Sequence, residues 1–134
     1  MKILKLTTVI LLIMISVGCE TKQEAARTNI SKTWKIDVVT RAGVDDTQNY
    51  KESRSGYNII FDTEGTFEET YTLFGSSSQS MVNGTWSLNN NVTILSLDSD
   101  FSSRTFTIDL LDETNLNLTD QGSADDLKIL LIPS

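Results

Sequence analysis

The chain has 134 residues, which favours a single domain, and it carries 18 acidic and 11 basic side chains, no histidine and one cysteine, Cys19. These counts exclude a Ser-His-Asp triad, a Cys-His pair, zinc sites built on His or Cys, and any intramolecular disulfide. Without Lys2 and Lys5, 9 basic residues remain against 18 acidic ones, so the rest of the chain repels phosphate backbones and we expect no nucleic-acid partner.

The first 18 residues have the pattern of an export signal. A short start with Lys2 and Lys5 is followed by the apolar run Leu6–Val17. Twelve helical residues rise only about 18 Å, which is too short for the ~30 Å hydrocarbon core of a membrane. The small residues Ser16 and Gly18 precede Cys19, as at a cleavage site. We therefore predict a signal peptide over residues 1–18.

The segment Ile15–Cys19 resembles a lipobox, in which the cysteine is lipidated and becomes the new N-terminus. More than one acyl chain gives stable anchoring, so we expect Cys19 to hold the protein in a membrane. The alternative is an ordinary secretory signal with an incidental thiol. Glu20 resembles the acidic export tags of some Gram-negative lipoproteins. We expect a cell-envelope location, in the outer membrane of a Gram-negative bacterium, with the polar residues 19–28 as a flexible tether.

From residue 29 to residue 134 the sequence predicts one all-β domain. Apolar and polar residues alternate at short intervals, and no stretch shows a convincing helical period. The strands are expected around residues 34–38, 57–61, 67–73, 82–88, 92–97, 106–110, 116–118 and 127–132. Eight consecutive strands with mostly short turns predict an antiparallel up-and-down barrel. Such a barrel is filled by side chains or holds one small ligand.

The connection Arg41–Gly56 is long and polar, except at Val44 and Tyr50. Connections of this length in compact domains are usually functional or disordered. It joins the first two predicted strands, so it can fold over one mouth of the barrel as a lid. The alternative is a solvated flap without a role.

Four stretches together resemble the lipocalin-like lipoproteins, small envelope proteins of some Gram-negative bacteria. They are Trp34 on the first strand, Ile59–Phe67, Asn83–Leu88 with its Gly-Thr-Trp, and Asn115–Leu118. The resemblance runs from about Ile30 to Pro133 and implies an eight-stranded lipocalin-like barrel. Gly-Thr-Trp also occurs in avidin-like barrels, which are the alternative fold together with a β-sandwich.

The first functional hypothesis is a binding module for a small hydrophobic or amphipathic ligand. Aromatic walls suit such cavities, and seven aromatic residues are predicted to point inward: Trp34, Tyr57, Phe61, Phe67, Tyr71, Trp86 and Phe106. The alternative is that these rings fill the barrel. A cavity well above about 300 Å³ would favour the ligand.

The second hypothesis is a surface-interaction or structural module that binds an envelope protein or a glycan through its loops, using an exposed Tyr50 and the acidic pair Asp45–Asp46. An enzyme is not expected, because Glu68 and Glu69 are strand neighbours that point to opposite faces. We expect no catalytic residue, metal or cofactor. Turn hydrogen bonding accounts for Asp98–Asp100 more simply than Ca²⁺ does.

Overall fold

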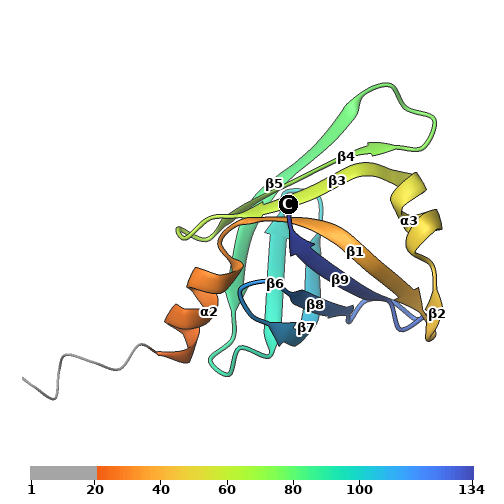
Figure 1. The fold of residues 1–134 in the computed structure, drawn as a ribbon. Helices are drawn as coiled ribbons and strands as arrows, with labels where there is room; N and C mark the ends of the chain where they lie inside the picture. The colour runs from red at the N-terminus through yellow and green to blue at the C-terminus, as the bar shows by residue number, and fades with distance from the viewer. Residues whose placement is uncertain (1–20) are drawn as a thin grey trace, which may run out of the picture.

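The computed structural model describes residues 21–134, so the predicted signal peptide and Cys19 lie outside the described residues. Eight antiparallel strands, each paired with the next along the chain, wrap into a barrel (Figure 1). The last strand pairs with the first over Trp34–Thr40 and closes the barrel. The predicted eight-stranded up-and-down barrel is confirmed.

The barrel strands are β1 (Thr33–Arg41), β3 (Arg54–Phe61), β4 (Thr66–Leu73), β5 (Gln79–Leu88), β6 (Ile94–Ser99), β7 (Ser103–Leu111), β8 (Leu116–Asp120) and β9 (Lys128–Pro133). A two-residue strand, β2 (Val44–Asp45), pairs with the end of β1. Two helices, α2 (Lys22–Ile30) and α3 (Thr47–Ser53), lie at opposite ends of the barrel (Figure 1). We refer to these ends as the α2 end and the α3 end.

Helix α2 occupies most of the segment that was expected to be a flexible tether. Thr21 and Glu24 form a capping box that satisfies backbone N–H groups at the start of the helix. Ala26 and Ile30 are buried against the barrel. The guanidinium of Arg27 lies 4.7 Å above the Trp86 ring. The helical period is hard to see in the sequence because only two of nine residues are buried, yet the segment is packed and not free.

Two register shifts change which residues face the core. Within β1 the pairing with β9 shifts between Ile36 and Val38, so Val39 is fully buried and Val38 is only partly covered. Within β7 the pairing with β8 shifts after Ile108, and Leu110 is left 42% exposed. Strict alternation predicts Val38 and Leu110 inside the barrel, and both predictions are wrong, because an irregular residue reverses the faces beyond it.

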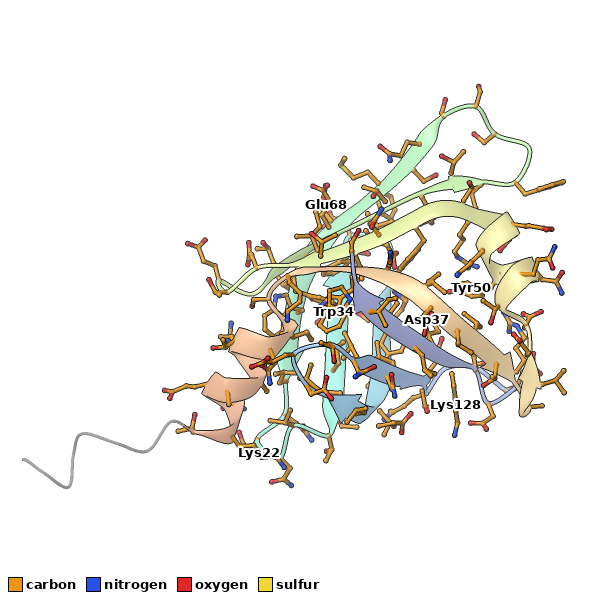
Figure 2. The ribbon with its side chains drawn as sticks, in the orientation of Figure 1. Lys22, Trp34, Asp37, Tyr50, Glu68 and Lys128 are labelled. Carbon is orange, nitrogen blue, oxygen red and sulfur yellow. The ribbon has the colours of Figure 1, made fainter. Side chains whose placement is uncertain are left out.

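Large aromatic side chains fill the α2 end. Trp34 is fully buried, and its Nε1–H donates to the carbonyl of Ile30 at 2.8 Å. Phe61 meets Trp86 edge to face, with ring centroids 5.8 Å apart. Figure 2 shows Trp34 in the interior of the barrel. This half of the molecule is therefore a packed core.

Gly84, in the Gly-Thr-Trp stretch, lets β5 and β6 approach each other. A Cβ at this position would collide with the carbonyl oxygen of Asp98 and would lie 2.8 Å from Cε1 of Phe67. Only glycine fits such a close backbone approach without a shift of its neighbours. The motif thus has a packing role in this barrel.

Candidate ligand cavity

The α3 end of the barrel keeps a cavity of about 170 Å³. Apolar side chains from five strands form its lining toward the barrel centre, among them Phe61, Leu97, Phe106, Leu118 and Ile129. The lining also contains a group of polar side chains: Arg41, Tyr50, Arg54, Tyr57, Glu69, Tyr71, Arg104 and Asp120. The cavity therefore combines an apolar floor with a polar, partly exposed rim.

The seven aromatic residues predicted to line a cavity divide between the two ends. Four of them line it: Tyr57, Phe61, Tyr71 and Phe106. The other three, Trp34, Phe67 and Trp86, are buried outside the cavity lining, in the core described above. Some of the seven rings thus line a cavity and the others fill the barrel. Alternation along a strand shows which face is inward but does not show which end of the barrel is filled.

The connection Arg41–Gly56 lies over the cavity through α3. Tyr50 of α3 lines the cavity and is only 9% exposed, so the expectation of an exposed Tyr50 is wrong; Figure 2 shows Tyr50 on α3. Asp46 accepts hydrogen bonds from Arg41 Nε at 2.8 Å and from Asn49 Nδ2 at 3.0 Å. Asp46 therefore takes part in internal contacts that hold the connection in place.

Glu69 is the buried charged residue of the described chain, with 5% of its surface exposed. Arg104 binds it in a bidentate manner, with Nη1 to Oε2 at 3.2 Å and Nη2 to Oε1 at 3.1 Å. The hydroxyl of Tyr57 donates to Oε2 at 2.5 Å. Both carboxylate oxygens are thus occupied, as a buried charge requires.

Two phenols of the lining, Tyr57 and Tyr50, have raised pKa values. Burial, together with the charge and hydrogen bond of Glu69, raises the pKa of Tyr57 well above its ordinary value. Burial likewise raises the pKa of Tyr50. Burial of Arg104 acts to lower its pKa, but the charge and hydrogen bond of Glu69 outweigh it and the pKa of Arg104 is raised. At neutral pH the phenols are therefore neutral and the guanidinium is charged.

Three of the four arginines in the sequence line this one cavity. Arg104 is paired with Glu69, and Arg41 is paired with Asp46 and, at 3.8 Å, with Asp125. Arg54 makes no ion pair within the described residues; its guanidinium lies 4.5 Å above the ring of Tyr50. Arg54 is therefore the cation of this rim that is free to meet a ligand.

The polar residues of the rim were missed at the level of sequence, although alternation could have found two of them. Glu69 stands between Phe67 and Tyr71, and Arg104 stands two positions before Phe106, so each has the parity of an inward residue. A charged residue at an inward position indicates a buried pair or a site. Arg54 had no such signal, because it belongs to the irregular connection.

The chain is similar to known proteins both in sequence and in fold. A family model described as a lipocalin-like domain matches residues 30–118. The chain belongs to the lipocalin-like domain family. This lipocalin-like chain is also similar in fold to a crystal structure of a lipocalin-like protein from Bacteroides uniformis, with a TM-score of 0.59 and 15% sequence identity. The match covers 79% of this chain and 99% of the other. A search of curated proteins found no match.

Two further findings concern the described part of this lipocalin-like chain. Within residues 21–134, no helix has both the length and the apolar character needed to cross a membrane. No group of three or more Cys, Asp or Glu residues in the same range is arranged to hold a metal ion.

Outside the barrel, Glu68 lines a surface hollow with Ile60 and Asn83, away from Glu69.

Proposed function

We propose that this protein is a lipid-anchored envelope lipoprotein whose lipocalin-like barrel binds one small amphipathic molecule. The cavity at the α3 end carries this proposal, because an apolar floor and a polar rim suit a molecule with both characters. Ligand pockets commonly measure about 300–1,000 Å³, whereas an apolar cavity of about 150 Å³ still accepts benzene. At about 170 Å³ this cavity suits a ligand, or a buried ligand part, of benzene size.

The membrane is the second partner in the proposal, through a lipidated Cys19. Only Glu20 and Thr21 separate Cys19 from α2 in the sequence. Two residues span at most about 7 Å, and α2 is packed on the barrel. An anchor at Cys19 would therefore hold the α2 end against the lipid surface and leave the cavity facing away from it.

Binding without catalysis is the activity that we propose. The acidic residue inside the cavity, Glu69, is held by Arg104 and Tyr57 and has no free oxygen to act as a general base. Asp120 lies on another strand of the rim and accepts the backbone N–H of Gly122 at 2.8 Å. Neither carboxylate has the partner that general acid–base chemistry would need.

Native mass spectrometry of the full-length protein, sprayed from detergent micelles, tests the binding proposal. We expect a species heavier than the acylated chain by a constant small mass, which disappears when the protein is denatured. The bare chain alone, unchanged after incubation with small aromatic and aliphatic compounds, would contradict ligand binding. The added mass would also give the chemical class of the natural ligand.

A second candidate function is an interaction module for an envelope protein or a glycan. Large apolar side chains are exposed on strands and loops of the α3 end: Val44, Leu73, Phe74 and Phe101 are between 49% and 88% exposed. Large apolar side chains that stay exposed can take part in a contact surface. A Phe74→Ser/Phe101→Ser variant should lose a cross-linked partner in whole cells if this function holds, and should keep any cavity ligand.

A further inference from the structure

We infer that the ligand of the cavity carries a single negative charge, and that it is a small monocarboxylate held by Arg54 at the rim. This inference rests on the proposed binding function and adds the chemical class of the ligand. It depends on the charges that line the cavity, on the partners that each charge already has, and on the shape of the apolar floor.

Three of the four arginines of this acidic protein line the cavity. Arg104 is paired with Glu69 and Arg41 with Asp46, so the charge of Arg54 is left without an ion-pair partner within residues 21–134. The other carboxylate of the lining, Asp120, accepts the backbone N–H of Gly122. Tyr50 and Tyr57 stay neutral, as shown above. One negative charge on the ligand would supply the partner that Arg54 lacks.

The partners of these groups identify the arginine that is available. Glu69 and Arg104 satisfy each other with two hydrogen bonds. Arg41 is drawn to Asp46 at the outer side of the rim. The remaining guanidinium, that of Arg54, has only the ring face of Tyr50 and a 3.5 Å contact from Nη1 to Ser53 Oγ.

The position of Arg54 suits recognition of a carboxylate. Arg54 stands where α3 ends and β3 begins, and it is partly exposed. A guanidinium that stacks on an aromatic ring keeps its N–H edge free, and this edge matches the two oxygens of a carboxylate. The Tyr50 ring therefore holds Arg54 in place and leaves its donors available.

The floor of the cavity limits the size and the polarity of the uncharged part of the ligand. Phe61, Phe106, Leu97 and Leu118 give it apolar walls, and a volume of about 170 Å³ accepts one ring or a short alkyl chain. An arylacetate or a short-chain fatty acid has these proportions. Phenylacetate is thus a suitable probe, with phenylacetamide as its neutral isostere and phenethylamine as a cation of similar size.

The test is isothermal titration calorimetry of the full-length protein in detergent micelles with each of the three probes. We expect phenylacetate to bind at least tenfold more tightly than phenylacetamide, and phenethylamine to bind more weakly still. Arg54→Gln should reduce phenylacetate affinity about tenfold and leave phenylacetamide affinity unchanged. Lys51→Gln is the matched control, because it removes one positive charge from an exposed position of α3, the helix that Arg54 follows directly, and lies outside the cavity lining.

The possible outcomes separate this inference from the proposed function. If phenylacetamide binds as tightly as phenylacetate, or if Lys51→Gln weakens phenylacetate as much as Arg54→Gln does, the carboxylate inference is overturned and ligand binding stands. If none of the three probes binds and native spectra show no added mass, both are overturned. Because Arg54 is partly exposed, its replacement should leave the fold intact, and the urea midpoint of each variant checks this.

Discussion

Glu69 shows how one residue can shape both the stability and the chemistry of the cavity. It lies on an inward position of β4, where its carboxylate meets Arg104 of β7 and Tyr57 of β3. Removal of one member of a buried ion pair is costly because the other charge stays buried without compensation. Glu69 and Arg104 lie on strands that are not neighbours in the sheet, so this ion pair crosses the barrel, whereas Tyr57 lies on β3, next to β4.

Glu69→Gln should lower the free energy of unfolding by about 2–3 kcal/mol, somewhat less than a fully buried pair would lose, because part of Arg104 reaches solvent. Glu68→Gln removes the same charge from the opposite face of β4 and should change stability by less than about 0.5 kcal/mol. Urea unfolding of both variants measures the difference. Equal midpoints for the two variants would mean that the Glu69–Arg104 pair contributes nothing.

Tyr57 should make stability sensitive to alkaline pH. Its pKa in the folded protein is raised well above 10, mainly by burial, so the unfolded chain releases this proton first. The contribution of protonated Tyr57 to the free energy of unfolding is fully present below about pH 10 and is lost as the pH rises above that value. Tyr57→Phe should unfold with a weaker pH dependence above pH 10 than the unchanged protein. Identical curves of unfolding free energy against pH for the two proteins would contradict the raised pKa of Tyr57.

At the scale of elements, the sheet is more predictable than the segments that cover its ends. Period-two alternation located all eight strands, because each has one buried and one exposed face. The bulges in β1 and β7 and the irregular end of β3 could not be predicted, since they depend on the pairing partner. Helices α2 and α3 were missed because each buries only one or two side chains, such as Ile30 and Tyr50, and so leaves almost no periodic signal.

The close approach of β5 and β6 at Gly84 can be tested by adding a single methyl group. Gly84→Ala should reduce the free energy of unfolding by about 1–3 kcal/mol, because the added Cβ forces the two strands apart and presses on Phe67. Gly122→Ala is the control, since its Cβ would meet the nearest atom, Asp120 Oδ1, at 3.4 Å. Thermal melts of both variants measure this, and equal losses would show that the approach is not specific to Gly84.

On the scale of the whole molecule, the cavity lies at the end of the barrel opposite α2, the helix that follows Cys19 in the sequence. The filled α2 end follows Cys19 directly in the sequence, whereas the rim with Arg54 belongs to the α3 end. This polarity could not be predicted, because the sequence shows neither that α2 packs nor which end is hollow. Together the two features give a barrel that would stand on the membrane and present its cavity outward.

Cys19→Ala should abolish membrane association. The variant lacks the proposed acylation site, and no helix within residues 21–134 is long and apolar enough to cross a membrane. Fractionation of cells that express the variant should move the protein from the membrane pellet to the soluble envelope fraction. Persistence in the pellet after a high-salt wash would overturn the lipid-anchor proposal.

The closure of the barrel between β1 and β9 has a kinetic consequence. Thr40 pairs with Lys128, and Trp34 pairs with Pro133, so the final seam joins residues roughly ninety to a hundred positions apart. Domains with such high contact order fold in about milliseconds to seconds, not microseconds. Until β9 is available for pairing, β1 lacks one of its two neighbours in the barrel, and its native hydrogen bonds cannot all form. If the proposed export takes place on the unfolded chain, the barrel would close only after β9 has also passed through the membrane.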